Sequence, residues 1–141
     1  MNTQTQTLTP QRRARADYLN LTLWTLQGWL TMFFAAAGYA KMTEPMDNLV
    51  SLLAWPARVS ENLVRGVGLA EIILAVLILA PLVSWRIGRP LLLTASVGLA
   101  GLEAIMLVVH ISGAQAGLAV INFLLLAITL PIIWFRFRPL L

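Results

Sequence analysis

A few ionisable side chains lie within stretches that are otherwise apolar. Glu71 follows Arg65 in the stretch RGVGLAEIILAVLILAP, and Glu103 and His110 share a later one. Carboxyl and imidazole groups can take up and release protons, and the cation of Arg65 can attract an anion or a carbonyl oxygen. In the apolar interior of a membrane, ionisable side chains mark a functional site by default. These groups could therefore bind a small polar molecule and exchange protons with it.

The composition shows what surrounds these groups. Of the 141 residues, 59% are hydrophobic and 11% are charged, whereas an ordinary soluble domain has about 25% charged residues. A soluble chain of this size buries only about two-thirds of its surface and needs polar residues to cover the remainder. This chain has too few of them, so it is predicted to be a membrane protein in contact with the lipid bilayer.

Four apolar stretches are long enough to cross a bilayer, which takes about 20 helical residues at 1.5 Å per residue. Segments of alternating polarity, typical of a transmembrane barrel, are absent from the sequence. We therefore predict an all-α fold, with a single four-transmembrane-helix bundle over residues 17–138 and a mobile cytoplasmic tail over residues 1–16. The expected spans are about Tyr18–Ala40, Asn62–Val83, Pro90–Ile111 and Gly117–Phe135.

Capping residues and prolines predict where these helices begin and end. Asp17 or Asn20 can cap the first span, and Ser60 or Asn62 the second. The first span is expected to end at the sequence KMTEP, because a proline disfavours helical geometry in the residue before it. Pro90 is expected in the first turn of the third span, where a proline loses no hydrogen bond.

The segment between the first two spans predicts a short amphipathic helix. Met46, Leu49, Val50 and Leu53 recur at helical spacing, and the pattern stops at Pro56. A short helix with one apolar face can lie in the membrane interface. We expect it at the outer surface, with Trp55 at the level of the lipid headgroups.

Basic residues predict the orientation of the chain. Cytoplasmic flanks of membrane helices carry an excess of Lys and Arg. The link HISGAQAG has neither, whereas three other flanks hold seven of the ten Lys+Arg residues: Arg12, Arg13, Arg15, Arg86, Arg89, Arg136 and Arg138. Both termini are therefore expected in the cytoplasm, with the chain in a bacterial-type inner membrane.

Polar and small residues recur within each span at intervals of three, four or seven. Residues seven apart differ by about 20° around a helix, so they share a face. By helical rise, Glu71 lies about 9 Å inward of Arg65, and Glu103 about 10 Å inward of His110. We expect both carboxylates at one depth, in a polar pocket in the outer half of the bundle. The sets are Asn20, Gln27, Thr31, Gly38 and Lys41; Gly68, Glu71 and Ala75; Ser96, Glu103 and His110; and Gln115, Asn122 and Thr129.

Charge balance leaves two states open for this pocket. Lys41 and Arg65 can neutralise Glu71 and Glu103, or one of the two carboxyl groups can be protonated. A purely structural role is the alternative to a functional one, because polar side chains also hold membrane helices together. The functional interpretation assigns proton transfer to Glu71, Glu103 and His110 and ligand binding to Lys41, Arg65 and Asn122.

Several kinds of chemistry find no support in the sequence. The chain has no cysteine, which excludes thiol catalysis and cysteine-ligated clusters, and its single histidine cannot form a bis-histidine haem site. It lacks a glycine-rich phosphate loop, a nucleophile elbow and a cluster with metal-ligand spacing, so no haem, flavin or metal is indicated. Its arginines are not gathered into one patch, so nucleic acid is not an expected partner.

The chain resembles the DoxX-like family of small four-helix membrane proteins. The resemblance covers about residues 20–135 and includes AAAGYAKM, the R-x-x-G-x-x-E core of RGVGLAE, a histidine late in the third span and an asparagine early in the fourth. The residues that carry it are Gly38, Lys41, Pro56, Arg65, Gly68, Glu71, Ala75, His110 and Asn122.

The resemblance implies work in a membrane redox system, because family members are linked to thiosulfate:quinone oxidoreduction or accompany oxidoreductases. We expect a membrane subunit whose pocket binds a quinone or another small substrate, with electrons supplied by a redox partner protein. A non-enzymatic accessory or assembly protein with a structural polar cluster is the first alternative, and a small solute transporter is the second. A homo-oligomer is a further expected association.

Overall fold

The computed structural model describes residues 9–138, and every regular element in that range is helical. The all-α prediction is therefore confirmed. Two 3-10 turns, η1 (Trp55–Arg58) and η2 (Ala80–Leu82), join some of the helices. The five helices are α1 (Pro10–Thr43), α2 (Met46–Leu53), α3 (Glu61–Ile78), α4 (Trp85–Ser112) and α5 (Ala116–Phe137).

Three segments of the described chain are long and apolar enough to cross a membrane. They are Glu61–Leu82, which joins α3 to η2, and the helices α4 and α5. Helix α1 is longer still, but Thr, Gln, Gly and Trp residues interrupt its apolar sequence. The first of the four expected spans therefore stays a prediction.

Two helix starts differ from the predicted ones. Helix α1 begins at Pro10 with Thr9 before it, so a start capped by Asp17 or Asn20 is wrong. Proline suits the first helical position, where its missing N–H has no acceptor to lose. Residues 1–8 of the expected tail lie outside the described residues.

Helix α4 begins at Trp85, so Pro90 lies inside the helix and not in its first turn. Gly88 already donates a backbone hydrogen bond of 2.7 Å to Ser84, which shows that the helix is formed before the proline. Two other predicted ends are confirmed. Helix α1 stops at Thr43, and the Ser60 hydroxyl accepts a hydrogen bond from the backbone of Leu63 at the start of α3.

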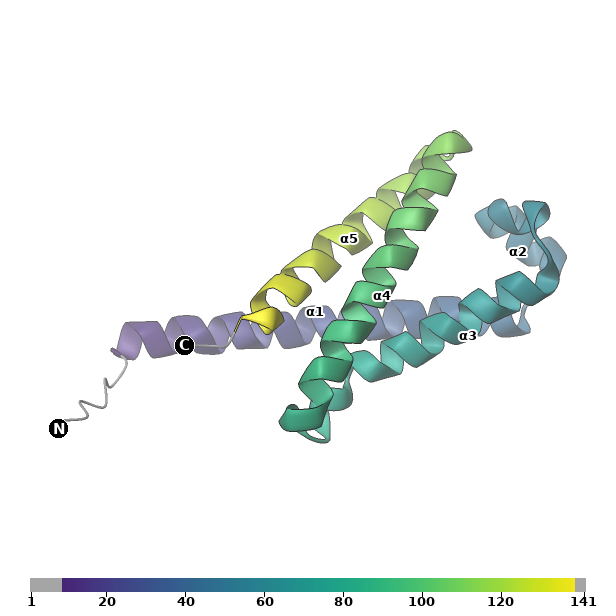
Figure 1. The fold of residues 1–141 in the computed structure, drawn as a ribbon. Coiled ribbons are helices and arrows are strands. Elements are labelled where there is room, and N and C mark those ends of the chain that lie inside the picture. The colour runs from purple at the N-terminus through teal and green to yellow at the C-terminus, as the bar shows by residue number, and fades with distance from the viewer. Residues whose placement is uncertain (1–8, 139–141) are drawn as a thin grey trace.

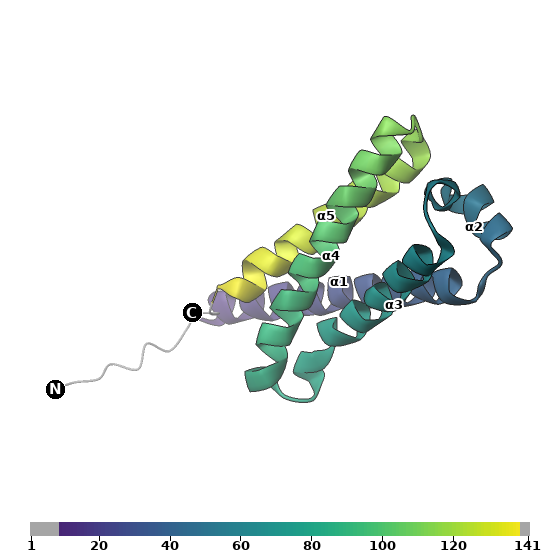
Figure 2. The same cartoon turned by 45° about the vertical axis from the view of Figure 1, so that its right-hand side comes forward.

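The four long helices form two antiparallel pairs, α1 with α3 and α4 with α5 (Figures 1 and 2). The pairs cross near η2, where α3 passes into α4, and diverge toward the end of the molecule that carries α2 (Figures 1 and 2). Contact between α1 and α5 is much less extensive than contact within either pair. The backbones of the two pairs are therefore farthest apart at the end of the molecule that carries α2.

Apolar residues from both pairs fill the crossing. Leu30 and Phe34 of α1, Ile78 of α3, Leu99 of α4 and Ile132 of α5 belong to one buried cluster. Many other large apolar side chains, such as Ile73 and Val108, stay exposed on the outer faces. Exposed apolar faces are what a helix in contact with lipid requires.

A second apolar cluster lies at the wide end, where α2 and η1 cover the space between the pairs. Leu49 and Trp55 pack with Val64 of α3, against Met106 and Val109 of α4. The predicted helix over residues 46–53 is present, and Trp55 is buried in this cluster, with 7% of its surface exposed; its position at the level of the lipid headgroups stays a prediction. Ala54, with a φ of 60°, lies between α2 and η1, and the chain turns there.

Two glycines let α1 and α3 touch through their backbones. A methyl group added at Gly38 would lie 2.5 Å from the Gly68 carbonyl oxygen, and one added at Gly68 would lie 2.8 Å from the Gly38 carbonyl oxygen. Small residues at such crossings are typical of membrane helices. The close approach lies one turn from Lys41 and Glu71, so it sets the distance between those two side chains.

We expect Gly38→Ala to separate α1 from α3 and to lower the free energy of unfolding by about 1–3 kcal/mol, as for other overpacked contacts. Unfolding with added SDS in lipid–detergent bicelles measures the change. Gly28→Ala on the same helix is the matched control, because a methyl group there meets no atom within 4 Å. Equal stability of the two variants would contradict the role given to this crossing.

Candidate functional site

A buried ion pair between Lys41 and Glu71 joins α1 to α3. The Lys41 Nζ donates hydrogen bonds to both carboxylate oxygens of Glu71, at 2.9 and 2.7 Å. Both side chains are buried, with 8% and 6% of their surfaces exposed. Such short, charge-assisted contacts are stronger than hydrogen bonds between neutral groups. The pairing of one predicted cation with one predicted carboxylate is therefore observed.

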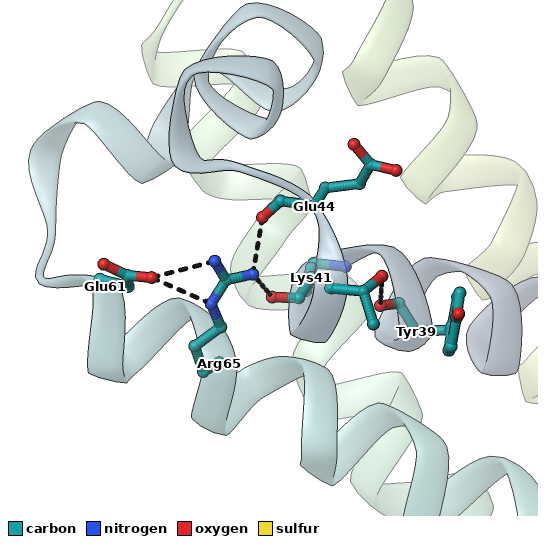
Figure 3. Close-up of polar contacts among 6 residues, drawn as sticks. Tyr39, Lys41, Glu44, Glu61 and Arg65 are labelled. Atoms are coloured by element: carbon teal, nitrogen blue, oxygen red, sulfur yellow. Dashed lines mark hydrogen bonds and ion pairs between the residues drawn. The ribbon is translucent and has the colours of Figure 1, made fainter.

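Arg65 has no hydrogen bond to Glu71 within residues 9–138 and contacts Glu61 and the backbone at the end of α1 instead (Figure 3). Its guanidinium forms an ion pair of 2.9 Å with Glu61, one turn earlier on α3. One of its nitrogens also donates to the backbone carbonyl oxygens of Lys41 and Glu44. These carbonyls are at the C-terminal end of α1, where acceptors lack helical partners. In the structure Arg65 caps α1, and it does not line the pocket described next.

A cavity of about 160 Å³ lies beside the ion pair, in the space between the two helix pairs. We call it the Lys41 pocket. Its polar wall consists of Lys41, Glu71, His110 and Asn122. The remaining wall is apolar and includes Phe34, Leu53, Trp55, Met106 and Leu125. Four of the six predicted site residues therefore come together here, from four different helices.

His110 and Asn122 have hydrogen-bond partners on neighbouring turns. His110 Nδ1 lies 2.6 Å from Gln115 Oε1, across the link between α4 and α5. With its proton on Nδ1 the ring donates to Gln115, and Nε2 is left as an acceptor. The Asn122 amide donates to the carbonyl oxygen of Leu118. Both side chains are thus held in place while they line the pocket.

Glu103 is buried elsewhere, between α4 and α5, and it does not line the Lys41 pocket. Its Oε1 accepts a hydrogen bond of 2.8 Å from Thr129, while Oε2 has no hydrogen-bond partner within residues 9–138. Ser96, one step of seven residues away, also has a buried hydroxyl without a partner in that range. The structure therefore separates the two carboxylates that were expected to share one cavity.

Residues 25–132 of the chain match the DoxX-like family. The chain belongs to the DoxX-like family. The matched range contains the whole polar wall of the Lys41 pocket. No curated protein and no solved structure matches the chain at a significant level. With its long apolar helices, this DoxX-like protein is an integral membrane protein.

At the opposite end of the bundle, a second polar cluster surrounds Arg136, a residue predicted only to belong to a basic flank. Its Nε and Nη1 donate to Gln27 and Asn20 of α1, both at 2.9 Å. Its guanidinium also lies about 5 Å from the ring centres of Trp24 and Trp85. Arg136 is 2% exposed, so this DoxX-like protein buries a cation at the end of its last helix.

A continuation of the seven-residue spacing would have predicted this cluster. Arg136 follows Thr129 by seven residues on α5, just as Gln27 follows Asn20 on α1. The other predicted polar faces are turned into the bundle, as expected. Their residues Gln27, Glu71, Ser96 and Thr129 are all buried. Within residues 9–138 no group of three His, Asp or Glu side chains could hold a metal ion.

Removal of one member of the Lys41–Glu71 pair would leave the other as an uncompensated buried charge. We expect Lys41→Met and Glu71→Leu each to lower the free energy of unfolding by about 3–5 kcal/mol. The double variant should lose clearly less than the sum of the two, and SDS unfolding in bicelles measures the coupling. Glu61→Gln is the control, because its exposed ion pair with Arg65 contributes about 0–1 kcal/mol. Strictly additive losses would contradict a direct interaction.

Proposed function

We propose that this DoxX-like protein is a membrane subunit of a redox system and that its Lys41 pocket binds a quinone headgroup or a substrate of similar size. The observation that carries the proposal is a cavity of about 160 Å³ whose lining includes a buried ion pair, an imidazole and an amide. An engineered cavity of about 150 Å³ in another protein binds benzene. The Lys41 pocket is therefore large enough for one six-membered ring.

The polar wall supplies the groups that a carbonyl-bearing ring needs. The ammonium of Lys41 has three N–H donors and gives two of them to Glu71, so one is left for a carbonyl oxygen. His110 Nε2 and the Glu71 carboxylate can hold or accept a proton beside such an oxygen. The apolar wall, with Phe34 and Trp55, suits the faces of the ring.

A quinone, when bound, exchanges two electrons and two protons with its surroundings. Within residues 9–138 no group of three His, Asp or Glu side chains could hold a metal ion, and in this proposal a partner protein supplies the electrons. In this proposal Lys41 and Asn122 orient the ring, and Glu71 and His110 exchange its protons. Glu103 and Arg65 have no place on the pocket wall and keep structural roles.

The proposal includes four membrane spans, with α1 as the first, both termini in the cytoplasm of a bacterial-type cell, and the Lys41 pocket in the outer half of the inner membrane. Helices α4 and α5 with the α3–η2 segment account for three crossings. The direction of α1, antiparallel to α3, supports the fourth. In this arrangement α2 lies at the outer surface.

Thiol labelling tests the number of spans, because the chain has no cysteine of its own. With four spans, a membrane-impermeant reagent should label Gln11→Cys and Ser112→Cys from opposite sides of the membrane. With three spans both positions would lie on one side, whatever the absolute orientation. In intact cells, labelling of Ser112→Cys alone is the expected result.

Titration calorimetry in lipid nanodiscs tests the binding itself, with 2,5-dimethyl-1,4-benzoquinone as the probe. We expect Glu71→Gln to raise the Kd about tenfold or more, because Lys41 loses the carboxylate that orients its ammonium beside the ring. Glu103→Gln is the matched control, because it removes a carboxylate of similar burial that lies off the pocket wall. Absence of binding to the unaltered protein, or an equal loss in both variants, would contradict the proposal.

A non-enzymatic accessory role is the second candidate. It is favoured by the use of both Glu71 oxygens in the contact with Lys41 and by the capping contacts of Arg65, all of which join helices to each other. In that case the unaltered protein would bind no ring compound, while it would still copurify with a larger membrane complex.

A further inference from the structure

A second hollow, an apolar groove of about 170 Å³, lies between α1 and α5. Three of its lining residues, Phe33, Ile121 and Leu125, also line the Lys41 pocket. The two hollows are therefore adjacent. We call the second hollow the α1–α5 groove.

The groove leads away from the polar wall toward the middle of the bundle. Along α1, Lys41 is about 12 Å from Phe33 and about 18 Å from Trp29 by helical rise. Along α5, Asn122 is about 9 Å from Ile128 by the same measure. Along both helices the groove therefore extends in the same direction, from the Lys41 pocket toward the crossing of the two helix pairs.

The side chains of the groove are apolar, and one side of it is open to the lipid-facing surface. Leu30 and Leu125 form its floor, with 1% and 8% of their surfaces exposed. Trp29 and Leu124 form its rim, with 62% and 55% exposed. A hydrocarbon chain could enter it sideways from the bilayer without any polar group leaving water.

We propose that the ligand of the Lys41 pocket carries a long apolar tail, and that this tail lies in the α1–α5 groove. The inference rests on the proposed function and narrows it, from any small ring compound to a lipid-soluble quinone with an alkyl or isoprenoid tail. The shared wall of Phe33, Ile121 and Leu125 places the start of the tail where the ring leaves the pocket. Binding and release then occur within the membrane.

Photolabelling tests where the tail lies. The probe is a 1,4-benzoquinone that carries an alkyl chain with a diazirine at its end, added to the protein in nanodiscs and mapped by mass spectrometry. The label should fall on residues 29–33 and 121–128, and excess tail-free 2,5-dimethyl-1,4-benzoquinone should displace it. Label spread evenly over all lipid-facing helices, as for a phosphatidylcholine with the same diazirine, would overturn the inference.

A pair of matched variants tests the groove by affinity. Leu124→Trp fills the rim of the groove and should weaken binding of the tailed probe about tenfold, because several methylene groups lose their site. It should leave binding of the tail-free ring within about twofold, since Leu124 is not on the wall of the Lys41 pocket. Leu130→Trp is the control, with the same substitution, the same helix and the same 55% exposure outside the groove.

The outcomes separate this inference from the proposed function. If the tail-free ring binds and depends on Glu71, while Leu124→Trp and Leu130→Trp behave alike with the tailed probe, the pocket stands and the tail site is wrong. If neither probe binds, the proposed function fails and the inference fails with it. Selective loss of the tailed probe in Leu124→Trp supports both.

Discussion

The buried ion pair of Lys41 and Glu71 is the interaction on which the rest of the site depends. A lone charge of either sign would be costly in these apolar surroundings, so each side chain fixes the other. The contact needs α1 and α3 to approach closely, and the facing glycines Gly38 and Gly68 permit it. The ion pair needs no side chain from α4 or α5. These two helices can therefore diverge from α1 and α3. The Lys41 pocket lies in the space that this divergence leaves, under the cover of α2.

Each antiparallel pair is also tied at one end by an arginine. Arg65 from the first turns of α3 donates to carbonyl oxygens at the end of α1, and Arg89 from the first turns of α4 donates to those of Arg136 and Phe137 at the end of α5. Carbonyl oxygens at a helix end lack partners and carry partial negative charge, which suits a cation. The two caps lie at opposite ends of the bundle, and both use arginines near the start of a helix.

Much of the architecture follows from periodicity, because the polar residues of each long helix recur on the face that is turned away from lipid. The seven-residue spacing of Ser96, Glu103 and His110 correctly predicted a buried face on α4. Spacing gives a face and a depth but not a partner. Arg65 and Glu71 are six residues apart on α3, which turns them to different neighbours. Glu103 meets Thr129 because α4 pairs with α5, and no pattern within one helix contains that pairing.

Arg136 has a consequence for the order in which the bundle can close. Asn20 and Gln27 lie on α1, and their side-chain oxygens accept hydrogen bonds from the last turn of α5. Until α5 packs, both amide oxygens lack these donors, although α1 can already pack against α3. The polar contacts of α1 are therefore complete only when the end of α5 is in place.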